Sequence, residues 1–247
     1  MARSETIFAM ADESIEGDAL PTAKQDPRAL SLAERYAPHI YFDRREPFLP
    51  VAVGYTIFAS PGPSPSFPRR IELAPPARLA VEYAIWWDWD ITHLYELEHI
   101  WVYVGEGGEV VCAEGSWHGR YRPLVADGRV PLEGDHVVVY AEPGKHAFHP
   151  TPELPPDLRR LIRQRCWEEA GEDGLLVTSL FEGEIAKTPE ADRLARAYLR
   201  RRAFEPSFAF TRSFAVERAT LLPWPSLREW IPGRIRWWLG QLRASAP

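Results

Sequence analysis

The sequence predicts a mainly β protein, an antiparallel β-sandwich with added helices, and two observations support this fold class. Runs rich in β-branched and aromatic residues crowd together between residues 69 and 140, and the segment GEGG at 105–108 is a hairpin signal between two of them. Helical patterns, with apolar residues three or four positions apart, are concentrated in the second half of the chain. A core of packed strands with helices added to it accommodates both patterns.

In the first half of the chain, the expected elements are one helix and a series of strands. Asp26 followed by Pro27 is a typical helix start, and Pro38 ends the helix. The proline-rich segment at 60–68 is expected to be a loop that does not pair in a sheet, because proline lacks the N–H of the ladder. Strands are expected at 39–42, 53–59, 79–89, 97–104, 109–113 and 136–141.

In the second half, helices are expected at 156–170 and 189–202, with a strand at 175–181 between them. The last stretch, 226–242, is an amphipathic helix with an interruption at Pro232 and Gly233. Its arginines and tryptophans are typical of helices that make peripheral contact with a membrane. A helix that packs its tryptophan face on the sandwich has the same pattern, and we expect this arrangement because the protein as a whole is acidic. The apolar stripe consists of Leu227, Trp230, Ile231, Ile235, Trp238 and Leu242.

Length and composition narrow the class of protein. With 247 residues, the chain is expected to form a single domain at 27–247, preceded by a loose tail at 1–26. The net charge of −6 argues against a nucleic-acid partner. Because no apolar run of spanning length and no secretion signal is present, the sequence predicts a cytoplasmic protein. Cys112 and Cys166 are then expected to be reduced thiols, and neither has the spacing of a zinc ligand.

Glu96 and Glu98 are the most informative residues for function. On a strand they share a face with Ile100 and Val102, so we expect them at one end of a row that faces the core. Two carboxylates in such a place are costly unless a bound cation, an arginine pair or a shared proton neutralises them. A solvated sheet edge is the alternative interpretation.

Three further residues belong to the same question. Asp88 and Asp90 share a face at the end of the preceding strand, and there they raise the same problem of buried charge. His93 lies three positions before Glu96 and can approach it from the turn.

Four short stretches resemble motifs of one superfamily, and they occur in the same order and spacing. They are LAERYAP at 32–38 with the strand and proline motif that follow it, HLYELEH at 93–99, SWHGRY at 116–121, and VVYA with GKHA at 138–147. The second resembles the GHRHDWE heptapeptide of the necrosis- and ethylene-inducing-like cytolysins. The chain thus resembles the superfamily that joins these cytolysins with the vacuolar-protein-sorting-sixty-two-like proteins, over roughly residues 32–150. This resemblance implies a β-sandwich.

The resemblance also implies a metal site. The ligands that it implies are His93, Glu96, Glu98 and, upstream, Asp88 or Asp90. Glu96 stands where the family has an aspartate, so its carboxylate reaches one methylene further. Oxygen-dominated ligands favour magnesium or calcium, which the family also implies, and one imidazole suits manganese, iron or zinc. We therefore expect a divalent metal ion as the cofactor, with magnesium or calcium ranked first.

The sequence leaves three functions open and does not decide whether the protein is an enzyme. We expect first a cytosolic metal-binding protein of unassigned activity, since no nucleophile elbow, phosphate loop or dinucleotide fingerprint is present. The second hypothesis is a metal-dependent hydrolase of an ester or phosphate, with His118 or His146 as general base or anion contact. Each of these histidines has the alternative role of capping a turn. The third hypothesis is binding of a lipid headgroup or membrane surface, as in the cytolysin branch.

Overall fold

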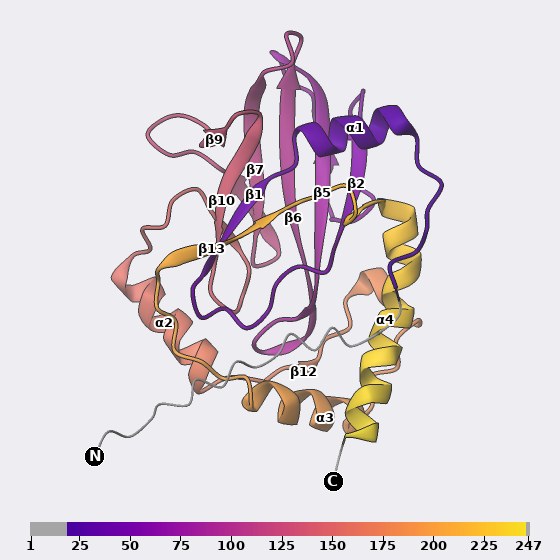
Figure 1. Cartoon of the computed structure of the whole chain (residues 1–247), viewed down its shortest axis with the longest axis vertical. Helices are drawn as coiled ribbons and strands as arrows, with labels where there is room; N and C mark the ends of the chain where they lie inside the picture. Colours follow the sequence, from indigo (N-terminus) through magenta and orange to yellow (C-terminus); the bar gives the residue numbers. More distant parts are fainter. Residues whose placement is uncertain (1–18, 246–247) are drawn as a thin grey trace, which may run out of the picture.

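The structure, a computed structural model, describes residues 19–245. Two mixed sheets pack over the main hydrophobic core, a smaller apolar cluster lies around Phe58 and Trp101, and the helices lie around the margins of the sheets (Figure 1). The predicted fold class, a mainly β sandwich with added helices, is therefore confirmed. The predicted tail lies largely outside the described residues, and residues 19–26 contain no helix or strand.

The larger sheet contains the long central hairpin of the fold. In spatial order its strands are β14 (Leu221–Pro223), β2 (Ala52–Phe58), β5 (Ala77–Trp89), β6 (His93–Gly105), β7 (Val110–Trp117) and β8 (Arg120–Pro123), with β12 (Gly174–Leu175) beside β6. The strands β5 and β6 pair antiparallel along most of their length, from Ala77 opposite Gly105 to Trp89 opposite Leu94. The turn that joins them is therefore held at one end of the sheet.

The smaller sheet is built from segments that are far apart in sequence. In spatial order its strands are β11 (Phe148–His149), β10 (His136–Ala141), β1 (His39–Asp43) and β13 (Phe210–Ala215), with β9 (Leu132–Glu133) beside β10. The pairs β1–β10, β2–β14 and β6–β12 are parallel, so the sheets are mixed rather than purely antiparallel. Strands β13 and β14, which the sequence patterns did not predict, come from the C-terminal part of the chain.

Side chains from both sheets meet in the core. The ring of Trp87 on β5 contacts Phe42 of β1 at 6.5 Å and Phe148 of β11 at 6.3 Å between ring centroids. All three side chains are buried completely. This aromatic contact layer fixes the separation of the two sheets beside the β5–β6 turn.

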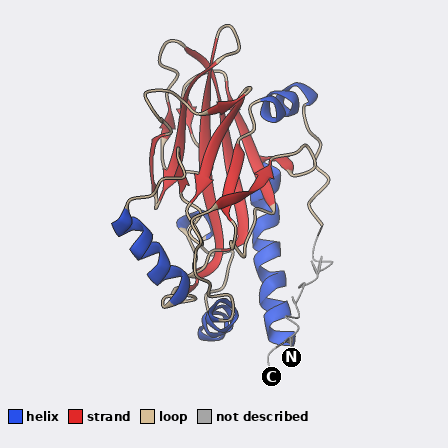
Figure 2. Cartoon of the chain, turned by 60° about the vertical axis from the view of Figure 1, so that its left-hand side comes forward, coloured by secondary structure: helices blue, strands red, loops and turns tan. Residues whose placement is uncertain are grey.

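The helices are α1 (Pro27–Arg35), α2 (Pro156–Trp167), α3 (Pro189–Arg200) and α4 (Trp224–Ala244), and a short 3₁₀ helix spans Ser179–Phe181. As predicted, Asp26 caps α1 by accepting the N–H of Arg28 at 3.0 Å. Helix α4 packs against β2, where Gly54 lets Trp224 and Leu227 approach closely (Figure 2). No helix in the described part of the chain is long and apolar enough to cross a membrane.

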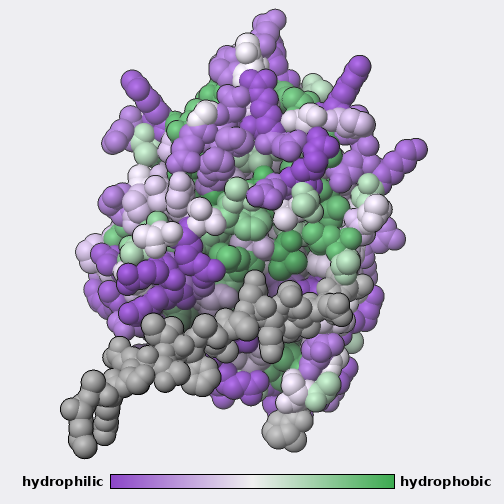
Figure 3. Space-filling model, in the orientation of Figure 1, coloured by the Kyte–Doolittle hydropathy of each residue, from purple (hydrophilic) through white to green (hydrophobic). Residues whose placement is uncertain are grey.

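The apolar stripe of α4 packs on the sandwich, which is the arrangement expected from the sequence. Leu227, Ile231 and Ile235 are buried, while Trp230 and Trp238 are partly buried against the same core. In the view of Figure 3, apolar side chains gather near the middle of the face and hydrophilic ones border them. Among residues 19–245, the large apolar side chains that remain exposed are Tyr121, Val125, Leu132, Leu161, Trp167 and Leu176.

Three expectations for individual elements are wrong. Gly62 and Pro63 do pair, as a two-residue ladder (β3, Gly62–Pro63) with β4 (Arg70–Ile71). The predicted strand at 175–181 ends after Leu175, because the side chains of Asp192 and Lys187 bind its backbone N–H and C=O in place of a neighbouring strand. Helix α4 continues through Pro232, which is buried in its interior. There the packing of α4 on the sandwich offsets the missing hydrogen bond.

Candidate functional site

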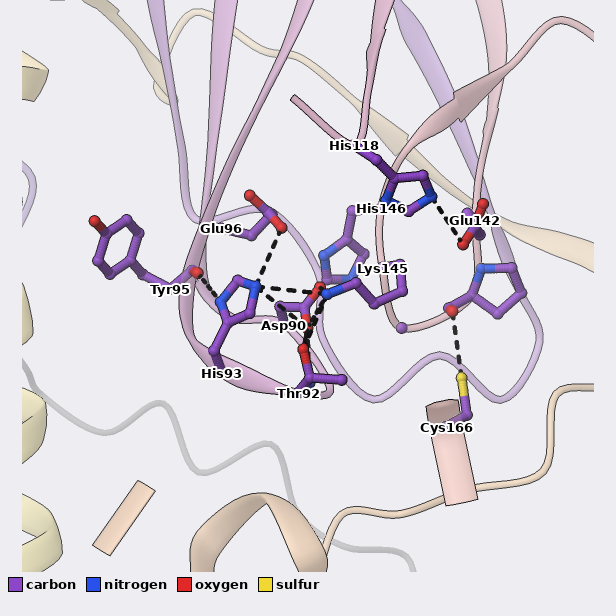
Figure 4. A network of polar contacts seen from close by, with 12 residues as sticks. Asp90, Thr92, His93, Tyr95, Glu96, His118, Glu142, Lys145, His146 and Cys166 are labelled. Carbon is purple, nitrogen blue, oxygen red and sulfur yellow. Dashed lines mark hydrogen bonds and ion pairs between the residues drawn. The ribbon is translucent and has the colours of Figure 1, made fainter. Parts of the chain in front are cut away.

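The turn between β5 and β6 places the first candidate residue. The side chain of Asp90 accepts hydrogen bonds from Thr92 N at 2.6 Å and from Thr92 Oγ1 at 2.8 Å. Its backbone N–H donates to His93 O at 3.0 Å. Asp90 therefore closes the turn, and its carboxylate is completely buried in a fixed orientation (Figure 4).

His93 directs one nitrogen toward two carboxylates. Its Nδ1 lies 2.6 Å from the carbonyl oxygen of Tyr95, so we assign the ring proton to Nδ1. The unprotonated Nε2 then lies 3.7 Å from Asp90 Oδ1 and 3.7 Å from Glu96 Oε2. Burial lowers the pKa of His93 and thereby favours the neutral ring. A neutral imidazole whose Nε2 lone pair faces two carboxylates is suited to bind a metal ion.

Glu96 and Glu98 point into the same cavity, as the alternation along β6 predicted. Backbone Leu97 N donates to Glu96 Oε1 at 2.9 Å, and the Ser116 hydroxyl donates to Glu98 in a short hydrogen bond. Burial raises the pKa of both carboxyls, to about 7 for Glu98, and the charges of Glu98 and Asp90 raise that of Glu96 further. No lysine or arginine among residues 19–245 forms an ion pair with either carboxylate.

Lys145 reaches the cluster from the turn between β10 and β11. Its Nζ lies 2.8 Å from each carboxylate oxygen of Asp90, 3.0 Å from Thr92 Oγ1 and 3.5 Å from His93 Nε2. Burial opposes the charge of both partners, yet their mutual attraction raises the pKa of Lys145 and holds that of Asp90 well below its usual range. Asp90 and Lys145 therefore form a buried ion pair.

Gly144 sets the position of that turn. Its φ is +70°, and a Cβ there would lie 2.8 Å from Ile91 Cγ2 and 2.9 Å from Cys166 Sγ. Its N–H donates to Glu46 Oε2 at 2.7 Å. Only glycine brings the backbone close enough for the next residue, Lys145, to reach Asp90.

These groups surround a cavity of about 430 Å³. Its wall includes His93, Glu96, Glu98 and Lys145 from the cluster. Helix α2 contributes Arg165, the loop that holds Ser66 and Phe67 covers one side, and the segment 176–180 covers another. The ligand atoms of Asp90, His93 and Glu96 lie within 4.8 Å of one another beside this cavity.

His118 also lies on the cavity wall. Its Nε2 lies 3.5 Å from Glu142 Oε1, and His149 Nε2 lies 3.3 Å from the other oxygen of Glu142. Burial opposes ionisation of Glu142, but the two histidines more than offset it and lower the pKa to about 2. Glu142 is thus an ionised carboxylate that orients His118, whose side chain is 33% exposed.

Two of the residues predicted for the site lie elsewhere. His146 is completely buried, stacked on Trp87 at 4.6 Å with its Nε2 3.4 Å from Glu46 Oε1, and it does not line the cavity. The carboxylate of Asp88 is bound by Arg234 Nε at 3.0 Å and Nη2 at 2.8 Å. The structure therefore brings Asp90, His93, Glu96, Glu98 and His118 together, and leaves Asp88 and His146 outside this group.

Sequence patterns missed Lys145, Arg165 and Glu142. Lys145 was visible only as one of three lysines in a chain with 29 basic residues, within the stretch GKHA. Arg165 lies among several other arginines of α2, so composition does not single it out. No local signal marks Glu142 as the partner of His118, because the two meet only through the fold.

Comparisons with known proteins give a limited result. No protein-family model and no curated protein matches the chain. Similar solved structures include necrosis and ethylene inducing protein 2 from the causal agent of witches' broom disease of cocoa (18% identity, 64% of this chain and 87% of that chain, TM-score 0.35). Others are NLPPya in complex with mannosamine (15%, 55% and 73%, 0.35) and with glucosamine (13%, 76% and 96%, 0.36). TM-scores of this size do not place the chain in a family.

The geometry of the cluster fits a metal ion. Bonds of about 2.0–2.4 Å to nitrogen or oxygen set neighbouring ligand atoms about 3–4 Å apart. The two separations of 3.7 Å around His93 Nε2 fall within this range. Two carboxylates and one neutral imidazole are a donor set that magnesium, calcium, manganese and zinc all accept, with the imidazole favouring the last two.

Proposed function

We propose that the protein binds a divalent cation at Asp90, His93 and Glu96, beside a cavity that receives a small polar ligand. The observation that carries this proposal is a charge excess. Asp90, Glu96 and Glu98 are three carboxylates at one buried site, and Lys145 supplies a single ammonium against them. A divalent ion would balance the remaining two charges and offset the effect of burial, which raises the pKa values of Glu96 and Glu98.

Metal content of protein purified without chelator tests the proposal. We expect one stoichiometric divalent ion in the natural protein, a lower melting temperature in EDTA, and loss of both properties in Glu96→Gln. Glu98→Gln should lower metal content as well. Magnesium and calcium rank first by their preference for oxygen ligands, and the imidazole makes manganese and zinc the next candidates.

Glu82→Gln is the matched control for this measurement. Glu82 is also a buried carboxylate, but Ser66 Oγ and Trp101 Nε1 donate to it, each at 2.7 Å. Its hydrogen bonds are complete without a cation, so its replacement should leave the metal content unchanged. Protein without metal and without any response to EDTA would contradict the proposed function.

A metal-dependent hydrolase is the second candidate, favoured by the contact of His118 with Glu142. When bound, a divalent ion polarises an ester or phosphoryl oxygen and lowers the pKa of water. His118 lies on the wall of the cavity and is oriented by Glu142, which is how a general base is held in place. Chromogenic esters and phosphate monoesters, assayed with manganese, test this candidate. Activity that survives in His118→Ala would exclude His118 as the base.

A lipid headgroup in the cavity and membrane contact through α4 are proposals with less support. The arginines of α4 are engaged within the protein: Arg228 with Glu184, Arg234 with Asp88, and Arg243 with Glu190. Absence of binding to anionic vesicles at low salt would remove both proposals. The proposed cytoplasmic location is supported by Cys112 and Cys166, both free thiols in the structure.

A further inference from the structure

Among the residues that the structure describes, Lys145 is the one lysine or arginine paired within the proposed metal cluster. Its Nζ lies 2.8 Å from both oxygens of Asp90 and 3.5 Å from His93 Nε2, which is the lone pair that a metal would use. The ammonium therefore sits among the same donor atoms as the proposed ion. We propose that Lys145 is a built-in competitor of the divalent cation, holding Asp90 in its absence and leaving when the cation binds. This inference rests on the proposed function.

Access to Asp90 supports the competition. The carboxylate of Asp90 has no exposed surface, whereas Lys145 lines the cavity and bonds to it directly. His93 and Glu96, the other two donors, line the same cavity. A cation that arrives through the cavity thus meets His93 and Glu96 first, and gains Asp90 only where the ammonium now lies.

Electrostatic repulsion makes joint occupancy unfavourable. An ion bonded to Asp90 and His93 would lie within about 4 Å of the present position of Nζ, since both donors contact it. Two cations at that distance in a buried site repel each other strongly, because little water lies between them to screen the charges. One of the two positions must then be vacated.

Lys145 can leave without a change in the backbone. Two hydrogen bonds hold its turn, from Gly144 N–H to Glu46 at 2.7 Å and from Lys145 N–H to Glu142 O at 3.1 Å. Neither bond involves the side chain of Lys145. The four-carbon stem already borders the cavity, where the Glu98 carboxylate is available as a new partner. Binding of the cation would thus exchange the Asp90–Lys145 pair for a Glu98–Lys145 contact.

Removal of the ammonium should therefore strengthen metal binding. Lys145→Met keeps the length and apolar stem of the side chain and removes its charge. We expect calorimetric titration with Mn²⁺ to give at least about tenfold tighter binding in Lys145→Met than in the natural protein, about 1.4 kcal/mol. Lys24→Met is the matched control, because Lys24 is exposed and does not line the cavity. Its Mn²⁺ affinity should equal that of the natural protein.

The outcomes separate this inference from the proposed function. Equal or weaker Mn²⁺ binding in Lys145→Met than in the natural protein would overturn the competition and leave the metal site intact. Binding in Lys145→Met alone would support the competition and contradict a metal function of the natural chain. Absence of binding in both proteins would overturn both statements.

Nuclear magnetic resonance of the natural protein tests the same movement without a substitution. With lysine labelled by ¹³C and ¹⁵N, the three lysines of the chain give few signals, and Lys24→Arg and Lys187→Arg identify that of Lys145. A diamagnetic ion, Ca²⁺ or Zn²⁺, should shift the ε-CH₂ signal of Lys145 selectively as the Asp90 contact is lost. An unshifted Lys145 signal in protein shown to hold the ion would overturn the proposal, even if Lys145→Met fails to fold.

Discussion

Asp88 and Asp90 lie two positions apart at the end of β5, both buried, but in opposite electrostatic settings. Asp88 receives two hydrogen bonds from Arg234 and one from Trp86 Nε1 at 3.1 Å. Asp90 lies near the carboxylates of Glu96 and Glu98, and Lys145 is the one lysine or arginine among residues 19–245 that forms an ion pair with any of the three. The charge of Asp88 is neutralised within the protein. Asp90 belongs to a cluster in which the carboxylates outnumber the cationic side chains.

Burial alone therefore does not mark a binding site in this molecule. A buried carboxylate whose partners are all present, such as Asp88, serves the packing of α4 on the sheet. A group whose carboxylates outnumber its cations and face a cavity, as around Asp90, is prepared for a positively charged ligand. Four changes would break or sharpen this contrast, and the first is the Mn²⁺ titration of Lys145→Met given above.

The largest effect on stability is expected at the ion pair of Asp88 with Arg234. Arg234→Met leaves Asp88 as a buried charge without its arginine, so the free energy of unfolding should fall by about 3–5 kcal/mol. The double variant Asp88→Asn with Arg234→Met should recover much of this loss, because no charge is left unpaired. Urea unfolding measures all three proteins. A loss below about 1 kcal/mol would place the pair among weak surface contacts.

At the carboxylate cluster around Asp90, the expected effect on the free energy of unfolding is smaller and depends on pH. The pKa of Glu98 rises from 4.5 to about 7 on folding, because burial disfavours its charge. Its contribution to stability is therefore complete below about pH 4.5 and is lost as the pH rises to about 7. In EDTA, the free energy of unfolding of Glu98→Gln should rise relative to that of the natural protein between pH 5 and 7.5, by on the order of 1 kcal/mol.

The pH dependence of stability also shows whether a metal ion or a shared proton neutralises the carboxylates. Added divalent ion should abolish the pH-dependent loss in the natural protein, because the bound cation replaces the proton on the carboxylates. Thermal melts in EDTA and in Mn²⁺, each at several pH values, measure this loss of stability. A difference between Glu98→Gln and the natural protein that stays constant with pH would contradict the raised pKa of Glu98.

The smallest effect is expected at the exposed end of α4. Arg243 pairs with Glu190 at 3.2 Å, and both side chains are 49% exposed. Arg243→Ala should change the free energy of unfolding by less than about 0.5 kcal/mol, since water screens the pair. A loss close to that of Arg234→Met would show that pairing, rather than burial, governs the Asp88 site. Urea unfolding again provides the measurement.

The sequence predicted the strands of the central hairpin because alternation is a local property. Glu96 and Glu98 share a cavity as expected, since β6 pairs with β5 without a register shift from Glu96 to Val104. The same rule failed for Asp88 and Asp90, because the chain leaves the strand after Trp89 and the turn redirects Asp90. The contacts of Arg234 with Asp88 and of Lys145 with Asp90 join residues 146 and 55 positions apart, and no local pattern carries that information.

Backbone conformation around the cavity has a consequence for how this protein would change under selection. Tyr95, His118 and His146 have φ values of 60°, 49° and 61°, in the region that favours glycine. Each costs about 1–2 kcal/mol relative to a glycine in the same conformation. Heat resistance as the sole criterion would therefore enrich glycine at His118, whose side chain is 33% exposed. It would not do so at Tyr95 and His146, because their buried, stacked rings contribute more to stability than the strain costs. His118 is the candidate base on the cavity wall, so a population selected in this way would become more heat-resistant and lose that imidazole.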